Sequence, residues 1–519
     1  MRCLLFLICG ALCARGAEFD VLIKGGRVVD GTGNPAFFAD VGVKHGKIVA
    51  LGKLSGTGER EVDAKGKVVC PGFIDVHTHA EEIDELPRAE NFVRMGVTTI
   101  VLGNCGSSVL DVGAFFKRLE ATNTSVNVAT LVGHGSVRSK IMGGSFMRPP
   151  TADELARMRK LVEQGMKDGA VGLSTGLIYL PGTFSKTEEI IELAKVASQF
   201  DGVYASHMRS EGEEIYDALN EVFRIAREAK IRAEISHIKL SGKQNWGQPD
   251  KVLATIEKAR AEGLDITHDQ YTYTASSTGI SQLVPEQARE GGKFKERLAD
   301  PAQKQKIIAE MKEKLRRGKR DDYSYVMIAE YKADRSLNGL NMVEAARRRR
   351  GSDSVDQQIE LILEMQANGG ASGVFHGINE DDLRAFLGHP NTMFASDSGI
   401  RQWKQGVPHP RGYGNNARVL AQYMRELGAI RLEDAVRRMT SLPASVFRVD
   451  DRGVLRRGAW ADLVVFDPAK VQDRATFEDP HHYATGFEAV FVNGVEVVAQ
   501  DEHTGARPGQ VLRHKAAAR

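Results

Sequence analysis

The sequence predicts an α/β protein in which a (β/α)8 TIM-type barrel is joined to a small β-sandwich. Two observations support this fold class. From about residue 70, short apolar segments alternate with longer helical ones, as in repeated βα units around a parallel sheet. Near both ends of the chain, the pattern changes to short β-segments separated by Gly, Asn and Asp turns. The 519 residues are enough for one large domain and a smaller one.

The barrel prediction rests on a series of strand and helix segments. Eight short apolar segments are expected to form its strands: 73–77, 98–102, 127–132, 170–174, 202–206, 233–236, 264–268 and 392–396. Helices are expected between them, for example at 151–167, 187–199 and 213–229. Eight such units can close into a barrel. Along the sequence, the seventh and eighth expected strands are much farther apart than the other neighbouring strands. We therefore expect an insertion between strands 7 and 8, at about 285–350, that could form a lid over the barrel mouth.

The remaining segments complete the domain organisation. We expect a signal peptide at 1–17, the N-terminal part of the β-sandwich at 18–69, the barrel at 70–450, and the rest of the sandwich with a loose tail at 451–519. The signal prediction rests on a basic start, an apolar stretch too short to span a bilayer, and small residues at a possible cleavage site. The protein is therefore expected to be exported, periplasmic or secreted, and free of the membrane after signal removal.

Composition narrows the expected partners. The chain has 70 basic and 68 acidic residues, a net charge of +2, so it offers no electrostatic case for binding nucleic acid or an anionic membrane. Cys70 and Cys105 are the cysteines that follow the expected signal. We expect Cys70 to start the strand that ends at His77, about 20 Å from the metal end, too far from Cys105 for a disulfide.

Metal-ligand side chains recur at the ends of the expected barrel strands. His77 and His79 follow the first strand at i and i+2, so they point to the same face. The carboxyl ends of barrel strands meet at one mouth. Further residues of ligand type follow other strands: Cys105, His207, His237 and Asp397. Each residue alone is a weak signal, but their joint occurrence predicts a metal site.

Several motifs resemble those of the D-aminoacylase, or N-acyl-D-amino-acid deacylase, family of the amidohydrolase superfamily. FIDVHTH, SHMRSEG, ISHIKLSG and ASDSG are similar to the superfamily motifs, and the family motifs are GNCG, VGHGSVR, GLSTGLIYLPG, YTYTASST and HPRGYG. They occur in the order of the family and cover essentially the whole mature chain. The resemblance implies zinc-dependent hydrolysis of the amide bond of N-acyl-D-amino acids, small-molecule substrates, to a carboxylic acid and a free D-amino acid.

The resemblance also implies a role for each metal-site residue. It implies one tightly bound zinc ion at Cys105, His207 and His237, and a second, weaker or vacant position at His77, His79 and Asp397. A zinc ion suits a thiolate with imidazoles. Other two-metal amidohydrolases commonly place a carboxylated lysine after strand four, but 170–175 contains no lysine. Cys105 would supply the anionic ligand instead.

Catalytic and substrate-binding roles are implied in the same way. Asp397 is the expected general base, and Tyr179 is expected to stabilise the oxyanion. The residues that match the family's carboxylate-binding positions are Arg411, Lys239, Tyr271 and Ser277. His134 either contacts substrate or has a structural role. Three alternatives stay open: a cyclic amide hydrolase of the dihydroorotase or hydantoinase type, a dipeptidase for D-amino-acid-containing dipeptides, and a non-catalytic scaffold.

Overall fold

The structure is a computed structural model that describes residues 17–515. The predicted signal peptide, residues 1–17, lies outside the described residues except for Ala17. Within the described part, no helix is both long and apolar enough to cross a bilayer.

A parallel barrel forms the centre of the molecule and confirms the predicted fold class. Its strands are β6 (Phe73–Asp75), β7 (Val97–Leu102), β8 (Asn127–Thr130) with its continuation β9 (Val132–Gly133), β10 (Gly172–Gly176), β11 (Val203–His207), β12 (Arg232–Ile235), β13 (Ile266–Gln270) and β17 (Thr392–Phe394). Neighbouring strands pair in parallel in this order. The barrel closes just beyond β17, where the Asp397 N–H donates to the His77 carbonyl at 2.9 Å.

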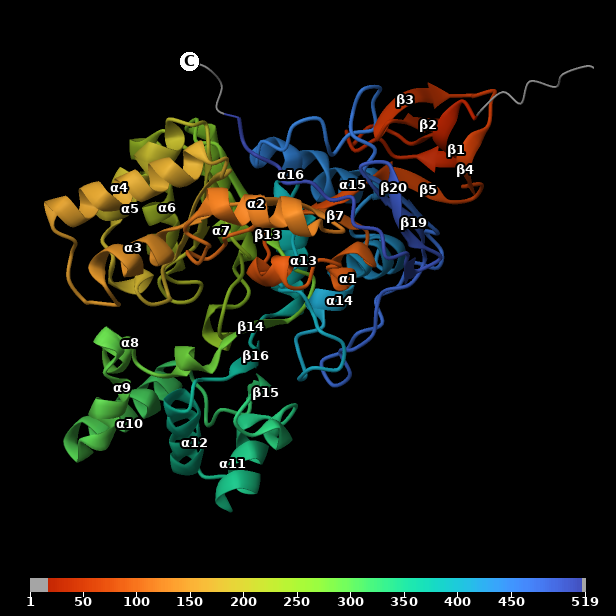
Figure 1. Ribbon diagram of the computed structural model, residues 1–519. Coiled ribbons are helices and arrows are strands. Elements are labelled where there is room, and N and C mark those ends of the chain that lie inside the picture. Colours follow the sequence, from red (N-terminus) through yellow and green to blue (C-terminus); the bar gives the residue numbers. More distant parts are fainter. Residues whose placement is uncertain (1–16, 516–519) are drawn as a thin grey trace, which may run out of the picture.

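Helices cover the outside of the barrel (Figure 1). They include α2 (Val112–Thr122), α3 (His134–Met142), α4 (Ala152–Lys167), α5 (Thr187–Ser198), α6 (Ile215–Ala229), α7 (Pro249–Ala261), α13 (Glu380–Gly388) and α15 (Leu432–Met439). Helix α4 illustrates the local causes: Thr151 and Glu154 form a capping box at its start, and Met158, Val162 and Met166 bury one face in the core. These helices surround the strands and leave the strand ends to form the mouth.

The two ends of the chain meet in one nine-stranded sheet beside the barrel. Its strands are β1 (Phe19–Val28), β2 (Phe37–Lys44), β3 (Lys47–Gly52), β4 (Gly58–Asp63), β5 (Val68–Pro71), β18 (Leu463–Phe466), β19 (Phe487–Val492), β20 (Val495–Ala499) and β21 (Glu502–His503). Figure 1 shows the red N-terminal strands next to the blue C-terminal ones. The link is β5, which pairs antiparallel with β18. Cys70 lies in β5, so the expectation that it starts the His77 strand is wrong: the barrel begins at Phe73.

The insertion between β13 and β17 is larger than predicted. It contains an antiparallel sheet of β14 (Ala275–Gly279), β15 (Val326–Glu330) and β16 (Ser372–His376), so the predicted bounds of about 285–350 were too narrow. Its helices are α8 (Glu286–Arg289), α9 (Phe294–Ala299), α10 (Pro301–Arg317), α11 (Met342–Arg350) and α12 (Val355–Ala367). They pack around a hydrophobic cluster of their own. Strand β14, ASSTG, is small and polar and carries little apolar signal, which is why the sequence pattern missed it. Strand β15, VMIAE, is apolar and lies within the predicted bounds, although the sequence analysis did not identify it as a strand.

Candidate metal centre

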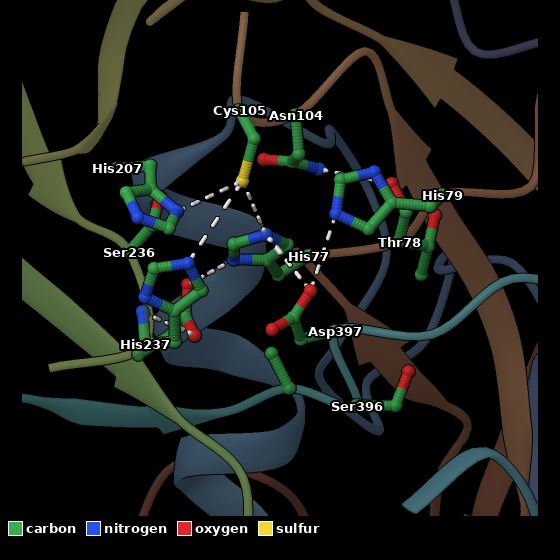
Figure 2. A network of polar contacts seen from close by, with 12 residues as sticks. His77, Thr78, His79, Asn104, Cys105, His207, Ser236, His237, Ser396 and Asp397 are labelled. Atoms are coloured by element: carbon green, nitrogen blue, oxygen red, sulfur yellow. Dashed lines mark hydrogen bonds and ion pairs between the residues drawn. The ribbon is translucent and has the colours of Figure 1, made fainter. Parts of the chain in front are cut away.

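All six predicted metal ligands meet at the mouth of the barrel, as Figure 2 shows. Each follows or ends a different strand, except that His77 and His79 both follow β6. Cys105 follows β7, His207 ends β11, His237 follows β12, and Asp397 follows β17. His79 is half-buried and the other five are buried. The sequence therefore located these residues correctly at one place, although their roles remain predictions.

The Cys105 thiol lies between two imidazoles at distances that fit a shared metal ion. Its Sγ is 3.6 Å from His207 Nδ1 and 3.9 Å from His237 Nε2. Zinc–sulfur and zinc–nitrogen bonds of about 2.3 and 2.0 Å at a tetrahedral angle would separate the donor atoms by about 3.5 Å. His207 Nε2 is buried and has no hydrogen-bond partner among the described residues, so no hydrogen bond fixes the ring at that nitrogen. The thiol and imidazole donors fit a zinc ion.

The second predicted group is also assembled. Asp397 Oδ1 lies 3.2 Å from His79 Nε2 and 3.5 Å from His77 Nε2. His77 Nε2 is 3.3 Å from Cys105 Sγ, so the thiol borders both groups of ligands. His77, His79 and Asp397 each offer one donor atom, and these three atoms all lie within 4.8 Å of one another. The mouth therefore contains donors for two adjacent cations.

The surroundings favour the ligand forms of two of these side chains. Burial alone would raise the pKa of Cys105, but His77, His207 and His237 hold it well below its usual range, which favours the thiolate. Burial and the neighbouring His237 lower the pKa of His207, which favours the neutral imidazole. A thiolate with a neutral imidazole is the protonation state that metal binding requires.

Three of the donor residues have left-handed backbone conformations. The φ angles are 52° at Cys105, 38° at His237 and 49° at Asp397. Such conformations cost free energy in residues other than glycine and persist only where the surroundings impose them. Beneath Cys105, a Cβ on Gly176 would lie 2.1 Å from the Cys105 carbonyl oxygen, so this position requires glycine. The backbone is thus shaped to direct these side chains into the mouth.

Two carboxylates that sequence reasoning missed support the histidines from behind. Glu211 Oε1 is 2.8 Å from His237 Nδ1, and Asp269 Oδ2 is 3.1 Å from His77 Nδ1. Asp269 Oδ1 also accepts from the His237 backbone N–H at 3.0 Å. With Nδ1–H donated to a carboxylate, each ring presents Nε2 to the centre. Asp269 could have been found because it lies in the expected seventh strand-end region, and Glu211 because it follows His207 by four residues.

The predicted substrate-binding residues lie in two different settings. Lys239 is buried and donates to Glu211 Oε1 at 2.5 Å and to the His237 carbonyl at 2.8 Å. Arg411 is buried with Nη1 2.9 Å from Asp397 Oδ2, and its guanidinium lies 4.5 Å from the ring centre of Tyr271. The Tyr271 hydroxyl and Arg411 Nε are buried without a hydrogen-bond partner among the described residues. Unpaired buried donors of this kind are ready to bind a polar group.

A cavity of about 730 Å³ opens onto the metal centre. Its walls include His79, Cys105, Tyr179, Ser277 and Asp397, so Tyr179 and three of the predicted metal ligands face a common space. Burial raises the pKa of Tyr179 well above its ordinary value, and the Cys105 thiolate adds to the shift. The Tyr179 hydroxyl therefore keeps its proton and can donate a hydrogen bond.

The insertion contributes to the wall of this cavity and contacts its rim. Ser277 and Thr278 of β14 line the cavity. Gly291 N–H donates to the Ser145 carbonyl at 2.9 Å, and the Met147 N–H donates to Glu290 Oε1 at 2.9 Å. Ser145 also lines the cavity, so the insertion reaches across to its edge.

His134 is held in a buried ion pair network. Its Nε2 lies 2.8 Å from Glu189 Oε1, and Glu189 also pairs with Arg138. His134 is fully buried and is absent from the walls of the cavity. Of the two roles left open for His134, the geometry favours the structural one.

The fold and donor set define a class: metal-dependent hydrolases with a (β/α)8 barrel. Comparison with known proteins agrees. The sequence-family model of the amidohydrolase family matches residues 60–498 of this chain. The chain is 37% identical to D-aminoacylase of Alcaligenes xylosoxydans xylosoxydans, over 96% of this chain and 98% of that protein. The chain therefore belongs to the amidohydrolase family.

Solved structures give the same result. One of them is a structure of D-aminoacylase described in terms of its binuclear metal centre, with one-metal activation and second-metal attenuation. It matches this chain with a TM-score of 0.82 and 36% identity, over 95% of this chain and all of that one. The N-acyl-D-glutamate deacylase of Bordetella bronchiseptica, with zinc and a phosphonate that mimics the tetrahedral intermediate, has a TM-score of 0.83 and 35% identity, over 95% of this chain and 99% of that one.

Proposed function

We propose that this protein is a zinc-dependent hydrolase of N-acyl-D-amino acids, which releases a carboxylic acid and a free D-amino acid. The observation that carries the proposal is the meeting of the Cys105 thiol with His207 and His237 at zinc-like distances, beside Asp397 and on a cavity. Similarity to D-aminoacylase and to N-acyl-D-glutamate deacylase over nearly the whole chain supports it.

Zinc is the proposed cofactor, with one tightly bound ion and a weaker second site. Cys105, His207 and His237 would hold the tight ion, and His77, His79 and Asp397 would hold the other. The D-aminoacylase with one-metal activation and second-metal attenuation supports this division. When bound, zinc supplies a Lewis acid for the amide carbonyl and lowers the pKa of water toward 7.

Asp397 is the proposed general base. Burial alone would raise its pKa, but Arg411 and His77 hold it well below the ordinary value, so the carboxylate is ionised at neutral pH. It would accept a proton from the attacking water and deliver it to the leaving amine. Tyr179, protonated and on the wall of the same cavity, would donate a hydrogen bond to the carbonyl oxygen as negative charge develops there.

The α-carboxylate of the substrate is proposed to bind next to Asp397. Arg411 and Tyr271 have buried donors that lack partners, and Ser277 lies on the cavity wall. Lys239 adds positive charge near Tyr271, with Nζ 5.8 Å from the ring centre. A carboxylate there would satisfy donors that are otherwise unpaired, and it would fix the orientation of the chiral carbon.

A hydrolysis panel with the zinc content measured on the same sample tests the function. N-acetyl-D-amino acids should be hydrolysed, and their L-enantiomers much more slowly. A hydantoin and a dipeptide with a C-terminal D-residue test the alternative cyclic amide hydrolase and dipeptidase activities. Preference for either over N-acetyl-D-amino acids would replace the proposal, and absence of amidase activity in a zinc-loaded sample would favour a scaffold.

Two further expectations are proposals of the same kind. The apolar segment near the N-terminus supports export to the periplasm or the medium, with cleavage near residue 17. Cell fractionation and N-terminal sequencing of the mature protein test this. The contacts of Glu290 and Gly291 with the loop at 145–147 support a lid role for the insertion. Replacing Glu290 with alanine, which removes the acceptor of the Met147 N–H, should alter kcat and KM together.

A further inference from the structure

Arg401 differs from the other two cations of the mouth because it has no anionic partner. Lys239 pairs with Glu211, and Arg411 pairs with Asp397. In the part of the chain that the structure describes, the Arg401 guanidinium forms no ion pair with a carboxylate. An arginine without a counter-ion near an active site can bind an anionic group of a substrate.

Arg401 is nonetheless held in a defined place. It lies in the loop between β17 and α14 (Arg411–Arg418), four residues after Asp397. Its backbone N–H donates to Asn91 Oδ1 at 3.1 Å, and its Nε donates to Ser398 Oγ at 3.0 Å. The two terminal nitrogens of the guanidinium donate to no other described residue. The side chain therefore has a fixed base and two donors that remain available.

These donors border a second cavity that adjoins the first. It has a volume of about 240 Å³, and its walls include Arg401, Ser277 and His409. Ser277 also lines the larger cavity at the metal centre, so it forms part of the wall of both cavities. This shared wall places Arg401 next to the proposed substrate site.

Arg401 lies among charges of both signs. Burial lowers its pKa and the neighbouring Arg411 lowers it further, whereas Glu82 and Asp397 act in the opposite direction. Glu82 and Glu330 line the same cavity, and Glu330 already accepts a hydrogen bond from Gln405 at 2.9 Å. Among the described residues neither acid forms an ion pair with the Arg401 guanidinium, so its terminal nitrogens stay available to an anion.

We propose that Arg401 binds the side-chain carboxylate of an acidic D-amino acid in the substrate, and that the cavity lined by Ser277 and Arg401 receives this side chain. The α-carboxylate keeps the position proposed above, at Arg411 and Tyr271. The proposal rests on the proposed function, because Asp397 must lie next to the leaving amine to protonate it. A side-chain carboxylate is a planar anion that a guanidinium can bind through two parallel hydrogen bonds.

The test compares Arg401→Met with the wild type on three substrates, using the zinc-loaded enzyme. These are N-acetyl-D-methionine, N-acetyl-D-glutamate and N-acetyl-D-methionine amide, which lacks a carboxylate. KM should rise about 10- to 100-fold for N-acetyl-D-glutamate and less than about 3-fold for the two methionine substrates. A large increase for both acids but not for the amide would place Arg401 at the α-carboxylate and would contradict the proposal. Equal effects on all three substrates, or no effect, would overturn the proposal.

Three variants control for charge and folding. Lys404→Gln removes a cation from an exposed position of the same loop and should leave all three KM values unchanged. Arg401→Lys keeps the charge and should lose less affinity than Arg401→Met, with a melting temperature near that of the wild type. Glu82→Gln should maintain or improve affinity for N-acetyl-D-glutamate. If instead Glu82→Gln raised KM and Arg401→Met lowered it, the cavity would receive a cation and the proposal would be wrong.

A binding measurement separates this proposal from the proposed function. Calorimetry with free D-glutamate and D-methionine reports on the subsite without turnover. If the wild type failed to hydrolyse the panel but bound D-glutamate in an Arg401-dependent way, with D-methionine binding independent of Arg401, the function would be wrong and the subsite correct. Turnover of N-acetyl-D-amino acids with binding that is independent of Arg401 would give the reverse result.

Discussion

Glu211 Oε1 lies 2.8 Å from Nδ1 of His237, so a residue outside the predicted ligand set supports a predicted zinc ligand. Hydrogen bonds from carboxylates to the outer nitrogen of ligating histidines fix the tautomer and strengthen metal binding. Asp269 does the same for His77 at 3.1 Å. Because Asp269 also accepts from the His237 backbone N–H, it supports both proposed metal positions, whereas Glu211 supports the His237 side.

Glu211→Gln should weaken zinc binding by about 10- to 100-fold. The neutral amide is a poorer acceptor for the His237 N–H, and it leaves Lys239 without its anionic partner. Competition with a chelator of known affinity measures the change. Glu213→Gln, an exposed residue two positions away, is the matched control and should bind zinc normally. Equal zinc affinity of Glu211→Gln and Glu213→Gln would remove Glu211 from this positioning role.

Asp397→Asn should reduce kcat by about a thousandfold while the tight zinc ion stays bound. The amide cannot accept the proton of the attacking water, but the Cys105, His207 and His237 donors are unchanged. Steady-state kinetics with metal analysis of the same sample checks both parts. Near-normal kcat would assign the base to another residue, and loss of all zinc would place Asp397 in the tight site.

Tyr179→Phe should reduce kcat by about 10- to 1,000-fold with a small change in KM. The variant loses a hydrogen bond that is proposed to strengthen as charge develops on the carbonyl oxygen. Thr278 lies 3.2 Å from the Tyr179 hydroxyl, so Thr278→Val is a useful control for loss of the local contact alone. An increase of KM in Tyr179→Phe at constant kcat would indicate a role in substrate binding instead.

Arg411→Met should raise KM for N-acetyl-D-amino acids more than Lys239→Met does. Lys239 already pairs with Glu211 at 2.5 Å, whereas Arg411 Nε is buried and unpaired. We expect about a 10- to 100-fold increase for Arg411→Met and about a 2- to 5-fold increase for Lys239→Met. The corresponding amide substrate should be affected less by both. A larger carboxylate-specific effect at Lys239 would contradict this order.

The sequence predicted the barrel and the six meeting side chains because both depend on local patterns. Apolar strands separated by amphipathic helices imply a parallel barrel, and the barrel brings strand ends together wherever they lie in the chain. His77 and Asp397 are 320 positions apart, yet their positions after strands one and eight make them neighbours.

The features that the sequence analysis did not predict depend on contacts that no local pattern encodes. The pairing of Lys239 with Glu211 follows from the path of two loops, and the left-handed backbone at Cys105 follows from tertiary packing. Strand β14 of the insertion was missed because ASSTG alternates neither in polarity nor in size. Cys70 was assigned to the barrel because an apolar run crosses directly from β5 into β6.

The buried contacts of Glu189 with His134 and Arg138 should make stability depend on pH. Burial alone would raise the pKa of Glu189, but His134 and Arg138 lower it below the ordinary value of 4.5. The ionised carboxylate thus stabilises the folded state at pH values above the unfolded pKa. As the pH falls through the lower folded pKa, the unfolded chain takes up the proton first and this stabilisation is lost.

At pH 7, Glu189→Gln should therefore unfold at a lower denaturant concentration than the wild type. Its free energy of unfolding should be lower by about 3 kcal/mol, because buried Arg138 loses its partner. The difference should shrink as the pH falls below about 4.5, since the wild type loses the same charge there. Urea unfolding from pH 7 to pH 4 measures it. Glu188→Gln, at an exposed neighbour, should show a small difference throughout. A Glu189→Gln deficit that stays constant across this range would mean that packing of the side chain, and not its charge, stabilises the network.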